Sequence, residues 1–389
     1  MIKQDLMKIK KITIIGPSKR FLSGISYYTI RLSNALSNYT NVKTILFRNM
    51  LPRRFFPGWK RVGKNLANIN FNEKVNVYEI LDWNNPFTWL KAFNLIKDSD
   101  VIILEWWTSS VAHMHLILEL LNRFSTKIPV VIEFHEVIDP LENSILPIRL
   151  YSKVMGKIVR KLSDHYVVHS KADKELISRV YKIPIDKISV IPHGIYDHYS
   201  KLDKAKDRLG IKENFVILFF GLLRPYKGVK YLIKAFERLP NDVVRESRLL
   251  IVGETWEDKE TIKLIAQSRL SNKITVINRY VPDDEVSLYF SASDVVVLPY
   301  TRASQSGVAH IAMHFGLPII ATDVGGLKES LSKYRGTIFV KPKDVNELVN
   351  ALLNVFNYYK NKVYTYPKEL KWDWIAKKWI KLINQKVIN

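Results

Sequence analysis

The stretch Gly221-Leu-Leu-Arg-Pro-Tyr-Lys-Gly228 follows the apolar run Phe215–Phe220 and precedes a helical pattern. A strand that runs into a glycine-bearing turn and then into a helix forms an anion site, because backbone N–H groups and the positive end of the helix dipole point at the turn. Arg224 and Lys227 add two full positive charges there, a forked guanidinium and a mobile ammonium. The sequence therefore predicts a diphosphate site at this turn.

A second stretch has the same character. Residues 299–308 read Pro-Tyr-Thr-Arg-Ala-Ser-Gln-Ser-Gly-Val, and a helical pattern continues to Phe315 before Gly316-Leu-Pro318 ends it. Ser304–Gly307 are residue types that begin helices and leave backbone donors for phosphate oxygens. We expect this turn and the first one to line the same cleft.

Short apolar runs alternate with helix-length segments along the whole chain, which predicts βαβ units with parallel sheets covered on both faces. A polar passage at residues 195–212 interrupts the series. We therefore predict an α/β fold of two doubly wound Rossmann-like domains facing a cleft. Residues 1–198 form the first domain, residues 199–367 form the second, and a helix at 368–389 packs back on the first.

The chain has 389 residues, no cysteine and a net charge of +23. The lack of cysteine excludes disulfides and thiolate metal sites. No apolar run reaches the roughly 18 residues of a spanning helix, and the charged start, Met1–Lys11, does not read as a signal peptide. We expect a cytoplasmic protein. The scattered positive charge fits either a solvated Lys-rich surface or an anionic partner such as a membrane.

The ordered motifs resemble the retaining glycosyltransferases of family 4, the glycosyl transferases group 1 with the GT-B fold. The resemblance covers nearly the whole chain. Its carriers are Ser23-Gly24-Ile25, Ile191-Pro-His-Gly-Ile195, the two turns above, Ile251-Val-Gly253, Asp294-Val-Val-Val-Leu-Pro-Tyr300, and Gly316-Leu-Pro-Ile-Ile-Ala-Thr-Asp-Val-Gly-Gly-Leu-Lys-Glu329.

The resemblance implies roles for individual residues. Arg224 and Lys227 would neutralise the leaving diphosphate, and His135 would lie beside the transferred sugar. Donor-binding residues would be Ser23, Gly24, Gly221, Arg224, Lys227, Ser306, Gly307, Val308 and Glu329. The reaction would need no metal and no cofactor beyond the nucleotide sugar, because preorganised positive charge stabilises the leaving group.

One departure concerns two glutamates that the family often carries eight residues apart. Their places are taken by Ala303 and Ile311 here, and Glu329 is a candidate substitute. His135 has an alternative interpretation as a structural histidine. Glu105-Trp-Trp107 belongs either to the core or beside the acceptor.

The stretch at residues 51–61 mixes basic and aromatic residues, which fits a lipid-facing loop better than a nucleic-acid site. A plain surface loop is the other interpretation. Its residues Arg53, Arg54, Phe55, Phe56 and Trp59 are our candidates for acceptor or membrane contact.

We therefore expect a glycosyltransferase that moves a sugar from a UDP-sugar or GDP-sugar to a lipid-linked or oligosaccharide acceptor with retention of configuration. It would act in glycan biosynthesis, with peripheral contact at the inner face of the plasma membrane and no nucleic-acid partner. Two alternatives stay open. One is a sugar-nucleotide epimerase or hydrolase of the same fold, for which Glu133, Glu136 and Asp139 are the available carboxylates. The other is a non-catalytic sugar-nucleotide binder.

Overall fold

The computed structural model describes residues 9–21, 24–52, 62–63, 69–303 and 305–388. The candidates Ser23, Arg53, Arg54, Phe55, Phe56 and Trp59 lie outside these ranges, as does Ser304. No helix among the described residues is long and apolar enough to span a bilayer.

The chain divides into two compact units, one running to Gly194 and resuming at Glu369, the other covering Ile195–Lys368. The first boundary falls slightly earlier than the predicted division after residue 198. The reason is that the intervening residues pack into the second unit. His198 Nε2 lies 3.8 Å from Asp283, and a Cβ atom on Gly307 would lie 3.2 Å from the Tyr196 ring.

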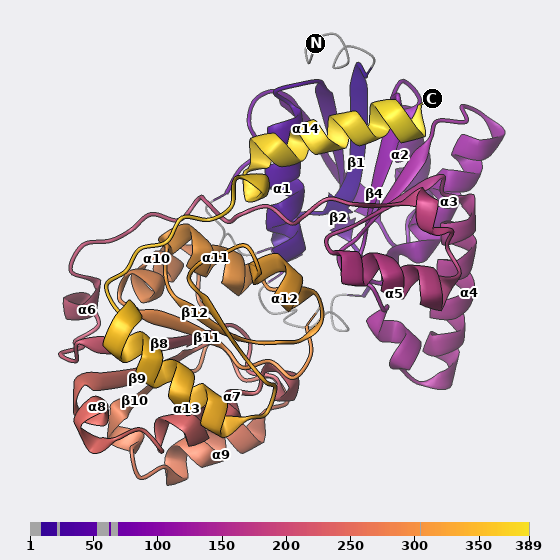
Figure 1. The fold of residues 1–389 in the computed structure, drawn as a ribbon. Coiled ribbons are helices and arrows are strands. Elements are labelled where there is room, and N and C mark those ends of the chain that lie inside the picture. The colour runs from indigo at the N-terminus through magenta and orange to yellow at the C-terminus, as the bar shows by residue number, and fades with distance from the viewer. Residues whose placement is uncertain (1–8, 22–23, 53–61, 64–68, 304, 389) are drawn as a thin grey trace. The chain divides into compact units, whose positions relative to one another are not determined.

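The first unit is built on a parallel sheet with the strand order β3-β2-β1-β4-β5-β6-β7 in the described residues (Figure 1). Its strands are β1 (Lys11–Pro17), β2 (Asn41–Asn49), β3 (Val75–Asp82), β4 (Val101–Trp106), β5 (Val130–Phe134), β6 (His165–Val168) and β7 (Ile188–Val190). Its helices are α1 (Gly24–Leu36), α2 (Pro86–Ile96), α3 (Ala112–Phe124), α4 (Leu146–Leu162), α5 (Lys171–Tyr181) and α14 (Trp372–Leu382).

Helix α14 comes from the end of the chain and packs on α1 (Figure 1). Trp379 is fully buried, and the Trp372 ring lies 5.3 Å from the Tyr28 ring, measured between centroids. Large aromatic side chains of this kind remove much apolar surface from water, so the helix is an integral part of the first unit.

The second unit has a parallel sheet with the order β10-β9-β8-β11-β12-β13 in the described residues. Its strands are β8 (Phe215–Phe220), β9 (Ser247–Val252), β10 (Ile274–Ile277), β11 (Val295–Leu298), β12 (Ile319–Thr322) and β13 (Thr337–Val340). Its helices are α6 (Ala205–Arg208), α7 (Val229–Phe236), α8 (Asn241–Glu246), α9 (Lys259–Gln267), α10 (Asp283–Ser291), α11 (Gly307–Phe315), α12 (Gly325–Leu331) and α13 (Val345–Asn354).

In both sheets the strand order reverses beside the first strand of the unit, between β1 and β4 and between β8 and β11. Chain segments leave such a point in opposite directions, so a crevice forms beyond the carboxyl ends of the two strands. The Arg224–Lys227 turn follows β8 and the Ser306 turn follows β11. The topology therefore brings the two predicted anion-binding turns to one switch point, within the second unit.

In the turn after β8, Lys227 does not itself begin the following helix. Pro225–Lys227 form a separate 3-10 turn, Gly228 has a positive φ of 66°, and α7 starts at Val229. A Cβ atom on Gly228 would lie 2.0 Å from the carbonyl oxygen of Pro299. Because Gly228 has no side chain, the backbone of the turn after β8 can contact the backbone of the loop after β11.

This contact gives a test with a built-in control, because Gly210 has the same φ of 66° with nothing within 4 Å of its ideal Cβ position. We expect Gly210→Ala to lower the free energy of unfolding by ~1–2 kcal/mol, the cost of a left-handed alanine. Gly228→Ala should cost ~2 kcal/mol more, because it adds a backbone clash. Urea unfolding of the full chain measures both values. Equal losses would show that the Pro299 contact is unimportant.

Candidate functional site

In the second unit, Lys227 reaches the start of α11 through an aromatic side chain. Its ammonium lies 3.8 Å from the centroid of the Tyr300 ring, and the Tyr300 hydroxyl lies 3.3 Å from Ser306 Oγ. The ring is fully buried, so it holds the cation in place through a cation–π contact. The structure thus brings Lys227 and Ser306 together, as the sequence predicted for a single anion site.

The beginning of α11 also lies close to the glycine that ends β8. A Cβ atom on Gly221 would lie 3.6 Å from Val308, in ordinary contact, while the φ of Gly221 is 114°. Ser306 is the N-cap residue, and its hydroxyl accepts a hydrogen bond from the backbone N–H of Ala309 at 3.4 Å. Because that hydroxyl caps the helix, the groups left to meet an anion are the first backbone amides, those of Gly307 and Val308.

Arg224 lies on a different aromatic surface. Its guanidinium is 4.9 Å from the centroid of the Trp256 ring, and Trp256 belongs to the loop after β9. The Nε atom of Arg224 is buried without a hydrogen-bond partner among the described residues, and so is the side-chain amide of Gln305, next to Ser306. Buried donors are normally satisfied in proteins, so these atoms are suited to a ligand.

The loop after β12 adjoins the same region. A Cβ on Gly325 would lie 2.1 Å from the backbone oxygen of Ala303, so the start of α12 touches the loop after β11. Glu329 is partly buried on α12. Ile311 is buried in α11 and packs as an apolar residue where the resembled family carries a carboxylate. The side chains of Ala303 and Ile311 therefore offer no acidic group here.

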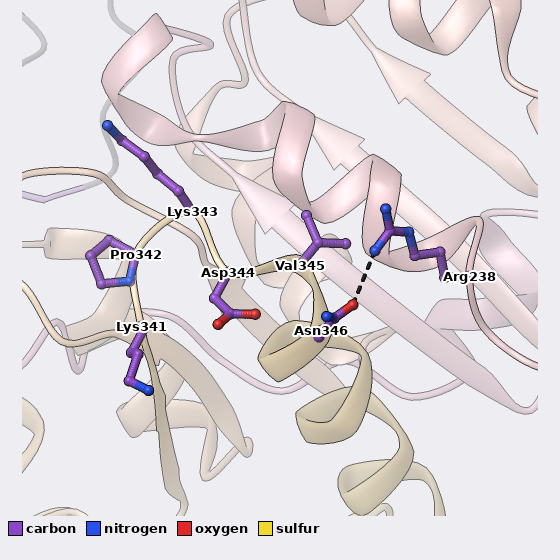
Figure 2. Close-up of a pocket in the computed structure, with 7 residues that line it drawn as sticks. All are labelled: Arg238, Lys341, Pro342, Lys343, Asp344, Val345 and Asn346. Carbon is purple, nitrogen blue, oxygen red and sulfur yellow. Dashed lines mark hydrogen bonds between the residues drawn. The ribbon is translucent and has the colours of Figure 1, made fainter.

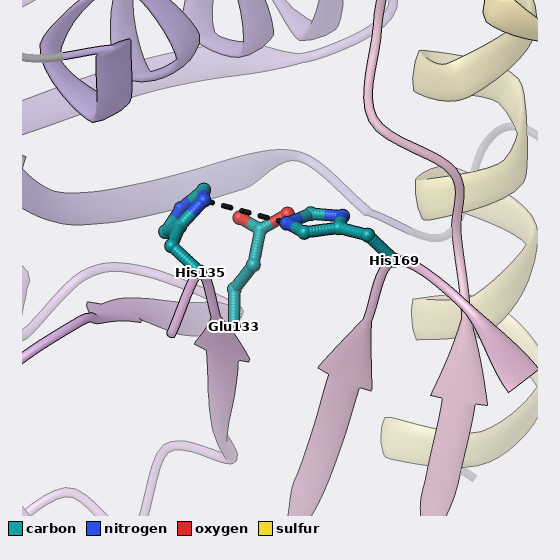
Figure 3. Close-up of side chains that lie close together, drawn as sticks. All are labelled: Glu133, His135 and His169. Atoms are coloured by element: carbon teal, nitrogen blue, oxygen red, sulfur yellow. Dashed lines mark hydrogen bonds between the residues drawn. The ribbon is translucent and has the colours of Figure 1, made fainter. Parts of the chain in front are cut away.

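In the first unit, Gly24 is the exposed first residue of α1 and His135 directly follows β5. His135 belongs to a chain of hydrogen bonds. His169 Nδ1 lies 3.0 Å from the backbone oxygen of Ile191, and His169 Nε2 lies 3.3 Å from His135 Nδ1 (Figure 3). Burial lowers the pKa of His169 to about 4 and that of His135 well below its usual value, so both rings are neutral at pH 7.

These contacts define the tautomer of each ring. A carbonyl oxygen only accepts, so His169 Nδ1 carries the proton and its Nε2 is an acceptor. His135 must then donate from Nδ1, which leaves its Nε2 with a lone pair. That atom is buried and has no partner among the described residues. His135 therefore presents a hydrogen-bond acceptor, suited to a hydroxyl group.

Beneath the two histidines lies a pair of carboxyl groups with no exposed surface. Glu105 and Glu133 are register partners on β4 and β5. Tyr28 donates to Glu133 at 2.5 Å and Thr29 donates to Glu105 at 2.5 Å. Burial raises the pKa of Glu133 to about 8, and burial together with the charge of Glu133 raises that of Glu105 well above its usual value. Glu105 is therefore a core residue at the switch point of this sheet.

One set of side chains in the described ranges has the donor types for a cation, namely Glu133, His135 and His169, whose ligand atoms lie within 4.8 Å of one another (Figure 3). The same groups are engaged in the Tyr28 and histidine hydrogen bonds described above. Neutral hydrogen bonding thus accounts for their proximity.

Two of the three carboxylates that an epimerase or hydrolase could use are buried and hydrogen-bonded within the first unit. Glu133 is buried under Tyr28. Asp139 is buried and accepts from the backbone N–H groups of Leu141 and Ser109. An acid or base needs access to substrate, which Glu133 and Asp139 lack, so of the three carboxylates the exposed Glu136 alone stays available to the epimerase or hydrolase.

A pocket at the start of α13 lies apart from these residues. It is lined by Arg238 and residues 341–346, and Arg238 donates to Asn346 at 3.0 Å (Figure 2). No predicted site residue lines it.

Sequence reasoning missed the side chains that contact the candidate residues. Tyr300 contacts Lys227 and Trp256 contacts Arg224. Tyr28 contacts Glu133 and His169 contacts His135. Tyr300 and Trp256 follow strands β11 and β9 closely, which is the signal that could have identified them.

Two family models match the chain in succession. "Glycosyltransferase Family 4" matches residues 22–198, and "Glycosyl transferases group 1" matches residues 202–369. These ranges correspond closely to the two units of the structure.

An uncharacterized glycosyltransferase of Methanocaldococcus jannaschii is 25% identical over 370 residues, covering 92% of each chain. A second one from this organism is 29% identical over 227 residues, where the match covers 54% of this chain and only 56% of the relative. Among solved structures, Anabaena HepE in complex with UDP has a TM-score of 0.65 at 16% identity, covering 97% of this chain and 96% of HepE. The family models and relatives identify the activity class and the structural likeness confirms the fold, so this chain is a glycosyltransferase with the GT-B fold.

Proposed function

We propose that the enzyme transfers a sugar from a nucleotide-diphosphate sugar to a lipid-linked or glycan acceptor with retention of configuration. One observation carries the donor assignment. Lys227 lies on Tyr300, and Tyr300 contacts the N-cap residue of α11, so a side-chain cation and a helix N-terminus are held together. A diphosphate satisfies both. HepE was solved with UDP, which supports a uridine diphosphate sugar as the donor, and a guanosine diphosphate sugar is the second candidate.

The proposed chemistry follows from these fixed charges. Negative charge develops on the departing diphosphate as the glycosidic bond breaks, and cations that are already in place stabilise it without reorganisation. Arg224 and Lys227 supply full charges, and the amides of Gly307 and Val308 supply the dipole of α11. Glu329 is proposed to contact the nucleotide sugar from α12. His135 is proposed to accept a hydrogen bond from a sugar hydroxyl through Nε2.

We expect UDP, GDP or one of their sugars to raise the melting temperature of the wild-type chain. Lys227→Ala and Arg224→Ala should weaken that ligand about 10- to 100-fold each, since each removes a charge-assisted hydrogen bond. Lys230→Ala is the matched control, because Lys230 lies on α7 and pairs with Glu260 at 2.9 Å. Thermal-shift titration over a panel of donors makes the measurement. Undiminished ligand stabilisation in both site variants would refute the donor site.

The reaction is expected to run without a metal ion, because Arg224 and Lys227 supply the positive charge. Turnover should be unchanged after exhaustive treatment with EDTA and should not rise when Mg²⁺ or Mn²⁺ is added. A chelator-sensitive rate that Mg²⁺ or Mn²⁺ restores would contradict this expectation.

The anomeric configuration of the product, read from proton NMR couplings, tests retention in the same assay.

The histidine chain predicts a separate effect on the first unit. His135→Ala should abolish transfer while donor stabilisation in the thermal-shift assay stays intact. His169→Phe keeps a ring but removes the acceptor for His135 Nδ1–H, so the His135 tautomer is no longer set. We expect kcat to fall roughly tenfold, because the hydrogen bond from the sugar hydroxyl to His135 Nε2 is weakened, with little change in the donor KM.

Nitrogen NMR of ¹⁵N-histidine-labelled protein checks the cause directly. The wild type should show His135 with a protonated Nδ1 and an unprotonated Nε2, and His169→Phe should show a mixture. A wild-type His135 that is protonated at Nε2 would overturn the assignment.

A further inference from the structure

Helix α4 in the first unit exposes a row of apolar side chains to solvent, called the apolar stripe below. Leu146, Leu150, Val154 and Ile158 follow one another every four residues and are 71%, 61%, 47% and 38% exposed. Residues spaced by four lie on one face of a helix. Isolated exposed apolar residues are ordinary, whereas a continuous row of branched ones indicates a surface that contacts something else.

A second stripe runs beside the first. Arg149, Lys153, Lys157 and Lys161 are also spaced by four residues, and all of them are exposed. The 17 residues of α4 contain no Asp or Glu. Arg149, Lys153 and Lys157 each immediately precede a residue of the apolar stripe, so the two rows lie side by side along the helix axis.

The opposite face of α4 attaches the helix to the first unit. Ser152, Gly156 and Val159 are buried, and the Ser152 hydroxyl lies 2.7 Å from that of Ser109. A Cβ on Gly156 would lie 3.5 Å from the Trp106 ring. The apolar stripe is therefore not the face that packs on the protein's own core, and nothing in the described ranges buries it.

From these two stripes we propose that α4 docks the enzyme on the surface of an anionic lipid bilayer. The apolar row would enter the boundary between head groups and acyl chains, and the basic row would meet lipid phosphates, which is the pattern of interfacial helices. A second copy of this chain fits less well, because a symmetric contact would place the same basic row against itself. The net charge of +23 favours the anionic surface as well.

The position of α4 links this surface to the proposed function, on which the following step rests. In a βαβ unit the helix starts at the carboxyl edge of the sheet, and α4 is the helix between β5 and β6 (Figure 1). The most exposed residues, Leu146 and Leu150, belong to the first half of α4, and His135 follows β5 at the same edge. Docking through α4 thus brings the edge that carries His135 toward the lipid that presents the acceptor.

The test is co-sedimentation of the full chain with vesicles of phosphatidylcholine alone and of phosphatidylcholine with 30% phosphatidylglycerol, a composition of roughly physiological anionic content. We expect binding to the anionic vesicles and much weaker binding to the neutral ones, with the difference lost at high salt. Replacing Leu150, Val154 and Ile158 by Gln removes the apolar row and keeps the helix propensity. That variant should lose about tenfold or more in vesicle affinity.

The charge variant replaces Lys153, Lys157 and Lys161 by Gln and should lose roughly 100-fold on anionic vesicles. Its matched control replaces the exposed Lys234, Lys259 and Lys263 of the second unit, which removes the same number of charges elsewhere. Circular dichroism and donor thermal shift should be unchanged in every variant, so a failure of docking is distinguished from a failure of the donor site.

Equal vesicle binding by the wild type and both α4 variants would overturn the proposal. It would also be overturned if the control variant lost as much affinity as the charge variant, because charge alone would then explain binding. A third result would assign the surface to self-association instead. In that case the wild type does not bind vesicles and forms a dimer in light scattering, and the variant without the apolar row is a monomer.

Discussion

The donor site proposed for this enzyme depends on a close backbone contact between Gly228 and the carbonyl of Pro299. The two residues belong to loops that follow β8 and β11, the strands on either side of the point where the order of the sheet reverses. Any side chain at Gly228 would separate the loops. Without one, Lys227 reaches Tyr300, and through Tyr300 the start of α11. The positive φ at this glycine is thus a condition for assembling the site.

Aromatic rings hold both cations of that site. Lys227 lies on Tyr300 and Arg224 lies on Trp256, and the ion pairs of the described residues include neither cation. This difference matters chemically. A carboxylate would cancel the charge that a diphosphate needs, whereas an aromatic face restrains the cation and leaves its charge available. The buried Nε of Arg224 and the side-chain amide of Gln305 lack partners among the described residues. These atoms are therefore also available to a ligand.

The candidate residues of the first unit differ in this respect, because the buried Glu133, His135 and His169 are neutral at pH 7. Burial raises the pKa of Glu133 to about 8 and lowers that of His169 to about 4. Each group is then satisfied by hydrogen bonds to neighbours rather than by ion pairs. A neutral, tautomerically defined His135 can accept a hydroxyl proton in a hydrogen bond without placing charge in the interior. The candidate residues of the second unit thus carry fixed charge, and those of the first unit are oriented neutral groups.

The amino-acid sequence by itself determined the two parallel sheets, the strands and the two turns that we propose as the anion site. Continuous β-branched runs are stable only when both faces are covered, and glycines with basic residues after a strand mark a phosphate turn wherever they occur. It also identified the motifs of the resembled family, down to the missing glutamates at Ala303 and Ile311. The tertiary structure alone decided that Lys227 ends a 3-10 turn, that Tyr300 and Trp256 position the cations, and that His169 sets the tautomer of His135. It also decided that α4 leaves an apolar row uncovered. These features depend on contacts between segments that are far apart in the chain. Residue type and spacing do not predict which of those side chains meet once the sheets have twisted and the loops have closed.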